Sequence, residues 1–128
     1  MDISLIIIIL IVFLAVTIFC LYCIFKNPKT SLMFRWTTIL SSLAVSGFAY
    51  LYTFNFVYSL NSNTRIHGWP VPLVILQRDA PGEPWLDYIG NTLFFGFPIN
   101  LLIFLGSWLL IIWIFNIFII RTNKQKMI

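Results

Sequence analysis

Three long apolar segments, separated by short polar stretches, dominate the pattern of hydrophobic and polar positions along the chain. The first covers residues 3–25 and contains no charged residue and no proline. The second covers residues 36–60 and is also uncharged. A helix rises about 1.5 Å per residue, so each segment is long enough to cross a hydrocarbon core of about 30 Å. Both segments therefore predict transmembrane helices.

The third apolar segment, residues 89–120, is longer than one membrane crossing requires. Proline is compatible with the first turn of a helix but costs about 3 kcal/mol in its interior. We therefore predict that the crossing helix begins at Pro98 and covers residues 98–120. Residues 89–97 then form either an interfacial segment or a kinked extra turn or two of helix ahead of this helix, and residues 121–128 form a basic tail.

The composition agrees with residence in a membrane. Of the 128 residues, 60% are hydrophobic and 9% are charged, whereas soluble domains carry about 25% charged residues. A soluble domain of this length could not bury so much apolar surface. The sequence thus predicts an all-α integral membrane protein, in which residues 1–128 form a single domain with three transmembrane helices.

The distribution of the basic residues predicts how the helices are oriented. Six of the eight Lys and Arg residues flank the first loop or lie in the C-terminal tail, namely Lys26, Lys29, Arg35, Arg121, Lys124 and Lys126. With three crossings these two regions lie on the same side of the membrane, and the positive-inside rule assigns that side to the cytoplasm. The predicted topology is N-out/C-in in the cell (plasma or inner) membrane, which makes residues 61–88 one extracytoplasmic loop.

This loop concentrates proline, tryptophan and charge within residues 65–88. Pro70 and Pro72 favour an extended backbone, and residues 79–82 are typical of a turn. Residues 73–76 are apolar but too short to cross a membrane, so we expect them to lie on its surface or over the helix ends.

Two interpretations of the loop remain open. It is either a stiff cover over the helices, whose charges keep it in water, or a recognition surface presented to a partner. Trp69 and Trp85 are suited to anchor its two limbs at the membrane interface. The candidate recognition residues are His67, Gly68, Trp69, Pro70, Pro72, Arg78, Asp79 and Trp85.

Small residues and an amide within the helices predict packing faces. Small side chains allow helix backbones to approach closely, and amides can hydrogen-bond between helices. We expect Asn100 or Asn116 to form such a bond across the bundle. The candidate helix-packing residues are Ser42, Ser46, Gly47, Ala49, Asn100 and Gly106.

The reactive side chains form no pattern typical of an enzyme or a metal site. The loop histidine and carboxylates match no known ligand spacing. No charged residue or histidine lies inside the predicted spans, whereas proton relays and ion-coupled carriers require such groups. No basic surface with interleaved aromatic residues indicates nucleic-acid binding. We therefore predict a non-enzymatic protein with no catalytic, cofactor-binding or metal-binding residues.

Three functions remain open. An accessory, structural or docking subunit of a membrane complex is favoured, because three helices with a small-residue face carry a stiff external loop. Its partners would be the lipid bilayer and either another membrane protein or a second copy of the chain. In length, three-span topology and basic tail, the chain resembles one class of phage holins, and this resemblance implies a self-assembling permeabilising protein. The third function is an extracytoplasmic recognition or protective module that acts through residues 65–88.

Overall fold

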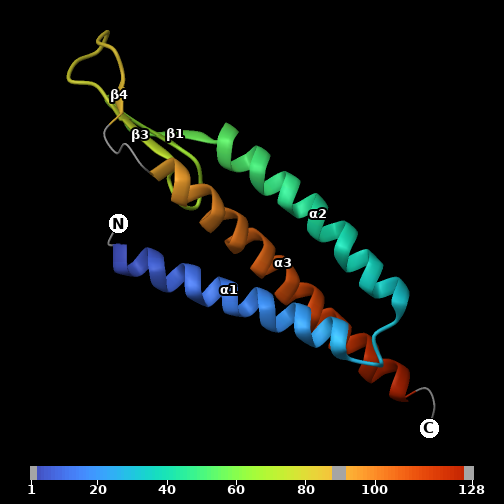
Figure 1. The fold of residues 1–128 in the computed structure, drawn as a ribbon. Coiled ribbons are helices and arrows are strands. Elements are labelled where there is room, and N and C mark those ends of the chain that lie inside the picture. The colour runs from blue at the N-terminus through green and yellow to red at the C-terminus, as the bar shows by residue number, and fades with distance from the viewer. Residues whose placement is uncertain (1–2, 88–91, 126–128) are drawn as a thin grey trace. The chain divides into compact units, whose positions relative to one another are not determined.

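The computed structural model describes residues 3–87 and 92–125 of the chain (Figure 1). It contains three helices, which are α1 (Ile3–Lys26), α2 (Leu32–Asn55) and α3 (Thr92–Gln125). Each helix contains a stretch long and apolar enough to cross a membrane. The prediction of three apolar, membrane-length helices is therefore confirmed.

The first helix agrees with its predicted bounds, whereas α2 begins at Leu32 rather than at Trp36. The Ser31 hydroxyl caps α2 by accepting a hydrogen bond from the backbone N–H of Phe34 at 3.2 Å. Arg35 precedes the predicted span 36–60 but lies inside the observed helix. Its side chain folds back, and its Nη2 donates a hydrogen bond to the Asn27 carbonyl at 3.0 Å. The charged residue is thus accommodated inside the first turn of the helix.

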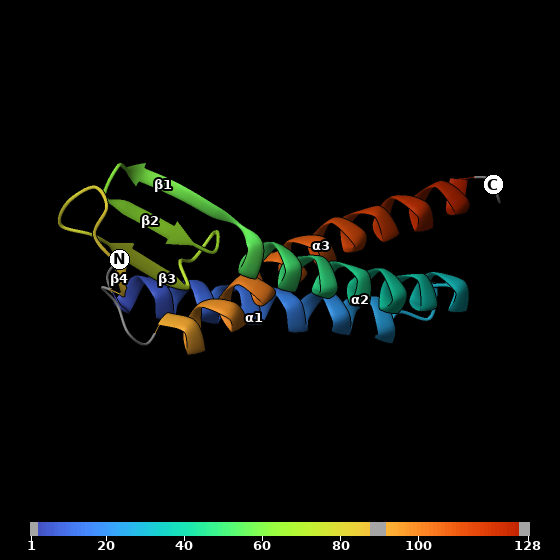
Figure 2. The same ribbon diagram turned by 90° about the horizontal axis from the view of Figure 1, so that it is seen from above.

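An antiparallel sheet of four strands follows α2, so the all-α part of the prediction is wrong (Figure 2). The strands pair in the order β1-β2-β3-β4. Their bounds are Val57–Asn61 for β1, Thr64–His67 for β2, Val74–Gln77 for β3 and Leu86–Asp87 for β4. The second helix therefore ends at Asn55 and not at residue 60, because the last residues of the predicted helix form β1.

Pairing between the strands gives most of residues 73–76 a strand conformation that the sequence did not predict. Three of these residues belong to β3, in which Ile75 lies opposite Ile66 of β2. Ile66 in turn lies opposite Tyr58 of β1. Three apolar side chains therefore stand in one row across the sheet, and cross-strand pairs of this kind stabilise sheets. Of the segment only Ile75 stands in this row, because Val74 and Leu76 point to the other face of the sheet, while Leu73 lies beside Gly96 of α3.

The third helix begins at Thr92, which places Pro98 in its interior. The helix extends beyond the predicted bounds 98–120 at both ends, whereas its apolar span of membrane length, Gly96–Thr122, agrees with them within two residues. Residues 89–91 of the predicted interfacial segment lie outside the described residues, while residues 92–97 are helical. Pro98 has no N–H to donate to the carbonyl of residue 94, so this part of the helix depends on stabilising contacts from elsewhere in the chain.

The chain divides into two compact units. Unit 1 comprises Met1–Ser46 and Leu102–Ile128, and unit 2 comprises Gly47–Leu101. The boundaries fall inside α2 and α3, so each of these helices contributes to both units.

Close contact between α1 and α3 defines the packing of unit 1. A methyl group added at Gly106 would lie 3.0 Å from Phe13 Cδ1 and 3.1 Å from Thr17 Oγ1. On the side of α2, Trp108 Nε1 donates a hydrogen bond to Ser41 Oγ at 3.1 Å. The buried apolar residues of this unit are Cys20, Ile24 and Leu109.

The outer surface of unit 1 is strongly apolar. Ile11, Leu43 and Phe115, one from each helix, are 58%, 66% and 64% exposed. Many other apolar side chains along these helices are similarly exposed. Soluble proteins rarely expose continuous apolar surface of this extent, whereas lipid is a favourable solvent for it. The chain is thus a mostly helical, membrane-embedded protein.

Candidate functional site

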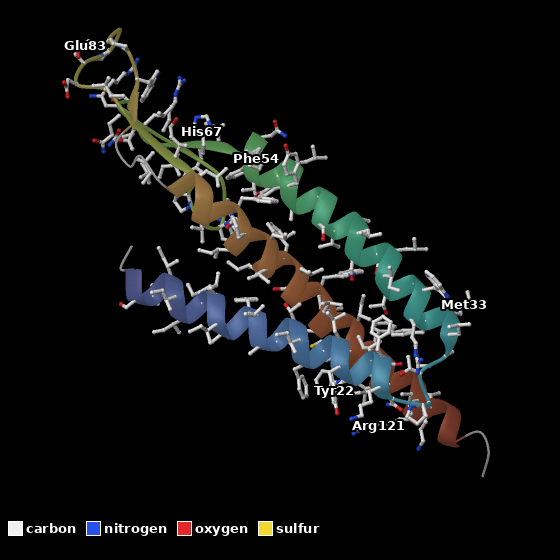
Figure 3. All side chains as sticks on the ribbon, viewed as in Figure 1. Tyr22, Met33, Phe54, His67, Glu83 and Arg121 are labelled. Carbon is white, nitrogen blue, oxygen red and sulfur yellow. The ribbon has the colours of Figure 1, made fainter. Side chains whose placement is uncertain are left out.

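The eight candidate recognition residues lie at the two ends of the sheet in unit 2. The first group ends β2 or lies in the β2–β3 loop (residues 68–73), and comprises His67, Gly68, Trp69, Pro70 and Pro72. The second lies in the β3–β4 loop (residues 78–85), and comprises Arg78, Asp79 and Trp85. In Figure 3, His67 lies near Phe54 at the end of α2, whereas Glu83 of the β3–β4 loop lies at the far end of the sheet. The structure therefore forms two sites from the predicted single surface.

The side chain of Asn100 holds the β2–β3 loop on α3. Its Oδ1 accepts a hydrogen bond from the Val71 N–H at 2.8 Å, and its Nδ2 donates to the Val71 carbonyl at 2.9 Å. Both residues are buried. The pair satisfies both backbone groups of a loop residue in a place that water does not reach. The sequence predicted a hydrogen bond from Asn100 across the helices, but the partner in the structure is the loop backbone.

A glycine one helical turn before Asn100 makes room for the same loop. A methyl group at Gly96 would lie 2.8 Å from Leu73 Cδ2 and 3.0 Å from the Pro72 carbonyl oxygen. Leu73 is only 2% exposed, and its N–H donates to the His67 carbonyl at 2.7 Å. Since Gly96 and Asn100 are four residues apart, they share one face of α3. This face receives the β2–β3 loop on both sides of Pro98.

Gly68 attaches the beginning of the loop to the end of α2. Its N–H donates to the Phe56 carbonyl at 2.9 Å, and its φ of 89° lies in the left-handed region. A methyl group at this position would lie 2.9 Å from Leu73 Cγ and 3.3 Å from the Thr53 carbonyl oxygen. Both the backbone conformation and the surrounding space therefore require glycine. The following Trp69–Pro70 peptide bond is cis.

Substitution of Gly68 by alanine is expected to destabilise unit 2 more than the same substitution at Gly82. Both glycines have positive φ values, of 89° and 99°, so each variant incurs a backbone cost of about 1–2 kcal/mol. Only Gly68→Ala also overpacks its surroundings, at a further cost of about 1–3 kcal/mol, since a methyl group added at Gly82 would meet no atom within 4 Å. The two variants are compared by their free energies of unfolding in detergent micelles. Equal losses would contradict the close packing at Gly68.

Aromatic side chains reinforce the attachment of the loop and of α3 to the end of α2. The rings of Tyr52 and Trp69 meet edge to face at 6.2 Å between centroids. Phe97 of α3 lies 5.6 Å from Tyr50 and 5.5 Å from Phe54. Pairs of this geometry contribute about 0.5–1.5 kcal/mol each beyond the burial of their area. The end of the sheet that carries His67 is thus held to both helices of unit 2.

At the other end of the sheet, Trp85 lies close to two guanidinium groups. The Cζ atoms of Arg65 and Arg78 lie 4.5 Å and 4.6 Å from the centroid of its ring, within the range of a cation–π interaction. The Nε and Nη2 of Arg78 also donate to the Ser62 carbonyl at 3.2 Å and 2.8 Å. Arg78 therefore links the β3–β4 loop to the turn between β1 and β2. The indole ring that the sequence suggested as a membrane anchor contacts two cations.

The turn in the β3–β4 loop lies one residue later than predicted. The Glu83 N–H donates to the Ala80 carbonyl at 3.1 Å, and Gly82 between them has a φ of 99°. Proline followed by glycine in the centre of a turn is typical of type II. Asp79 and Glu83 are exposed beside this turn. Across residues 3–87 and 92–125, no three His, Cys, Asp or Glu residues lie close enough together to hold a metal ion.

The strand β1 is an edge of the sheet, since it pairs only with β2 among the strands that the structure describes. It carries no charged residue and no proline. Val57 and Leu60 on this strand are 47% and 67% exposed. Edge strands present unpaired backbone donors and acceptors, to which an extended segment of another chain can add. The strand β1 is thus an uncharged and partly exposed edge of the described sheet.

The candidate helix-packing residues occupy different environments. Ser46 Oγ bonds to the Ser42 carbonyl at 2.8 Å within α2, while Ser42 Oγ is buried without a hydrogen-bond partner among the described residues. In unit 2, Ala49 is fully buried, but a methyl group at Gly47 would meet nothing within 4 Å. Gly106 is the small residue in close contact with a neighbouring helix, as described above.

Two residues of these sites were not predicted from the sequence. The sequence could have indicated Gly96, because a glycine and an asparagine four residues apart in a helix share a face. Arg65 had none, since its contact with Trp85 depends on the register of the strands. The chain matches no family model, no curated protein and no solved structure with which it was compared.

Proposed function

We propose that the protein is a small, non-enzymatic accessory subunit that docks onto another integral membrane protein through the edge strand β1. The partner supplies an extended segment that adds to the sheet beside β1. The observation that supports this most directly is the exposed and uncharged edge of β1, with Leu60 67% exposed. Natural sheets usually protect such edges with charge, proline or a bulge. The strand β1 carries neither charge nor proline, and its irregularity is confined to Leu60, between Ser59 and Asn61.

The position of β1 favours a membrane protein as the partner. This strand begins two residues after the end of α2, a helix of membrane-spanning length. Its free backbone groups then lie close to the membrane interface, where unsatisfied hydrogen-bonding groups are costly. A strand supplied by a neighbouring membrane protein would satisfy them.

The attachment of the sheet favours docking over a mobile loop. Asn100 binds Val71 through two hydrogen bonds, and Gly68 donates to the Phe56 carbonyl. A surface that is ordered before binding loses less conformational entropy when it binds. The sheet thus forms a fixed platform on the helices of unit 2.

The distribution of charge supports an N-out/C-in topology in the cell membrane, with the sheet on the extracytoplasmic side. Lys26, Lys29 and Arg35 surround the turn between α1 and α2. The segment between α2 and α3 is near neutral, because its two arginines are balanced by three acidic residues. Under the positive-inside rule, the α1–α2 turn is cytoplasmic and the sheet is external.

Site-specific photocrosslinking in cells tests the docking proposal. The photoreactive amino acid benzoylphenylalanine replaces Leu60 on β1 or, as a matched control, Leu86 on β4, which are 67% and 61% exposed. We expect position 60 to crosslink to an extended segment of one integral membrane protein, identified from the crosslinked peptide, and position 86 to give no such product. Introduction of a charge at the edge by Ser59→Lys should abolish the crosslink at position 60.

Other outcomes distinguish the alternatives. A crosslinked dimer of the chain would show that the partner at β1 is a second copy of the chain and not another protein. Entry of a membrane-impermeant dye upon induced expression, without a crosslink at position 60, would favour a permeabilising protein. Equal crosslinking at positions 60 and 86 would contradict the role of β1.

A further inference from the structure

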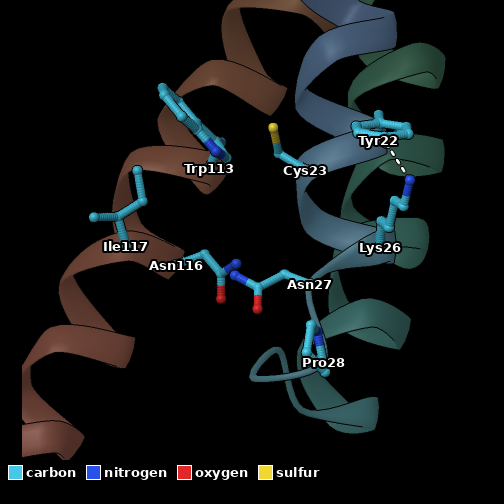
Figure 4. Close-up of a pocket in the computed structure, with 8 residues that line it drawn as sticks. All are labelled: Tyr22, Cys23, Lys26, Asn27, Pro28, Trp113, Asn116 and Ile117. Carbon is cyan, nitrogen blue, oxygen red and sulfur yellow. Dashed lines mark hydrogen bonds between the residues drawn. The ribbon is translucent and has the colours of Figure 1, made fainter.

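A cavity of about 320 Å³ lies in unit 1, where α1 ends beside α3 (Figure 4). The side chains that matter for its chemistry are Tyr22, Lys26, Asn27, Trp113, Asn116 and Ile117. A water molecule occupies about 30 Å³ in the liquid, so the cavity has room for a group of roughly ten non-hydrogen atoms. This is the size of a phospholipid headgroup with its phosphate.

The polar wall of the cavity offers hydrogen-bond donors and a positive charge. The Lys26 ammonium group donates to the Tyr22 hydroxyl and lies 4.6 Å from the centroid of the same ring. Figure 4 shows the side chains of Asn27 and Asn116 pointing toward each other across the cavity. Asn116 is held in place because its Nδ2 donates to Thr30 Oγ1 at 2.9 Å. The two amides thus lie between α1 and α3, and the exposed ammonium group of Lys26 lies beside Tyr22 on α1.

Apolar side chains of α3 line the cavity beside Asn116. These are Trp113 and Ile117, and the Trp113 ring is fixed by an edge-to-face contact with Phe19 at 5.4 Å between centroids. Trp side chains favour the depth at which lipid headgroups meet acyl chains. The cavity therefore combines a polar and an apolar wall in the way that an amphipathic ligand requires.

The surroundings of the cavity are positively charged and contain no acidic residue. The sole Asp or Glu of unit 1 is Asp2, which precedes α1, and the 24 residues of α1 rise about 36 Å between Ile3 and Lys26. Arg121 follows Ile117 by one helical turn, and Figure 3 shows it at the same end of unit 1 as Tyr22. The charge on Lys26 consequently has no nearby carboxylate in the sequence of this unit.

Arg35 adds a second cation beside the cavity wall. Its Nη2 donates to the carbonyl of Asn27, a lining residue, at 3.0 Å. Its Nε is buried and has no hydrogen-bond partner within the described part of the chain. Arg35 itself does not line the cavity, but its bond to Asn27 holds its charge close to the cavity wall. Basic pockets between transmembrane helices are suited to anionic headgroups.

We propose that this cavity binds the headgroup of an anionic glycerophospholipid. The phosphate lies against Lys26 and the two asparagine amides, and the glycerol and first methylene groups lie along Trp113 and Ile117. This binding site is independent of the docking strand β1, which belongs to unit 2. It requires only that the chain is embedded in a bilayer.

The proposal is tested with the full chain reconstituted in phosphatidylcholine vesicles. One set of vesicles contains brominated phosphatidylglycerol, and the other contains brominated phosphatidylcholine. Bromine quenches a neighbouring indole, and the signal of Trp113 is obtained by difference from Trp113→Phe. We expect stronger quenching by brominated phosphatidylglycerol. The preference should persist at high salt, because hydrogen bonds to the buried Asn116 and the half-buried Asn27 are screened less than an exposed charge such as that of Lys26.

Two variants with opposite expectations locate the site. Lys26→Gln should reduce the preference for phosphatidylglycerol about fivefold, as for loss of one cation near an anionic group. Lys29→Gln removes the same charge from an exposed position in the same turn that does not line the cavity, and should leave the preference at high salt unchanged. Equal effects of the two variants would show that the anionic lipid is attracted by the positive charge of the protein surface in general, and would overturn the proposal.

A volume variant and a soluble competitor complete the test. Cys23→Phe fills the cavity without a change in charge and should abolish the preference, with helix content checked by circular dichroism. Retention of the preference in this variant would place the lipid elsewhere. Displacement of the brominated lipid by millimolar glycerol phosphate would show that a soluble phosphate compound, and not a lipid, is the ligand.

Discussion

The variant Asn100→Leu is expected to lower the free energy of unfolding of unit 2 by about 2–6 kcal/mol. Leucine has the same number and branching of side-chain non-hydrogen atoms but cannot bond to Val71, whose N–H and carbonyl are both paired with the Asn100 amide at 2.8 Å and 2.9 Å. A buried backbone group left without a partner costs about 1–3 kcal/mol, and two such groups are created. The β2–β3 loop should then detach from α3 before the rest of the unit unfolds.

Amide hydrogen exchange of residues 68–73 in detergent micelles measures this detachment. Asn55→Leu is the matched control, because Asn55 is exposed and its Nδ2 bonds only to the Leu51 carbonyl within α2. We expect that control to change stability by less than about 0.5 kcal/mol. Similar exchange rates for the loop in both variants would show that the Asn100 amide does not hold it.

The variant Gly106→Leu is expected to force α1 and α3 apart in unit 1. A Cβ at this position already lies 3.0 Å from Phe13 Cδ1 and 3.3 Å from the Phe13 carbonyl oxygen. The remaining atoms of leucine have no space, and overpacking of this kind costs about 1–3 kcal/mol or more. Since a backbone oxygen is one of the close atoms, rotation of a side chain alone cannot relieve the contact.

Gly47→Leu is the control for this variant, with an effect of opposite sign. Gly47 lies in α2 with no atom within 4 Å of an added methyl group, and replacement of a helical glycine by leucine favours the helix by up to about 1 kcal/mol. The free energy of unfolding and the rate of Cys20 labelling by a small thiol reagent measure the outcome, because Cys20 is fully buried in unit 1. Faster labelling is expected in Gly106→Leu alone. Equal rates in both glycine variants would contradict the close packing of α1 on α3.

The extent of α1 was predictable because it depends on the composition of one uninterrupted segment. Residues 3–25 contain neither charge nor proline, and the transfer of such a segment into lipid is favourable whatever surrounds it. The predicted and observed ends therefore agree closely. The same argument accounts for the number of membrane-length helices.

The sheet was not predictable in the same way. The residues of β1 continue the apolar segment of α2 without a charge or a proline to separate them. Their strand conformation depends on pairing with β2, in which Tyr58 lies opposite Ile66. A strand of four or five residues is too short for an alternating pattern to identify it. Proximity of Arg65 and Arg78 to Trp85 depends in turn on the register of these strands.

The length of the apolar segments and the placement of charge thus established that lipid surrounds this chain, and they established the number of its long helices. This was possible because the free energies of transfer of the individual side chains into lipid add up along a segment. The start of α3, the tolerance of Pro98 inside it and the partner of Asn100 came from the fold. Each of these depends on the approach of the β2–β3 loop to the Gly96 face of α3. Hydrogen bonds and close contacts are properties of pairs of groups, and residues 29 positions apart become a pair only when the chain brings them together.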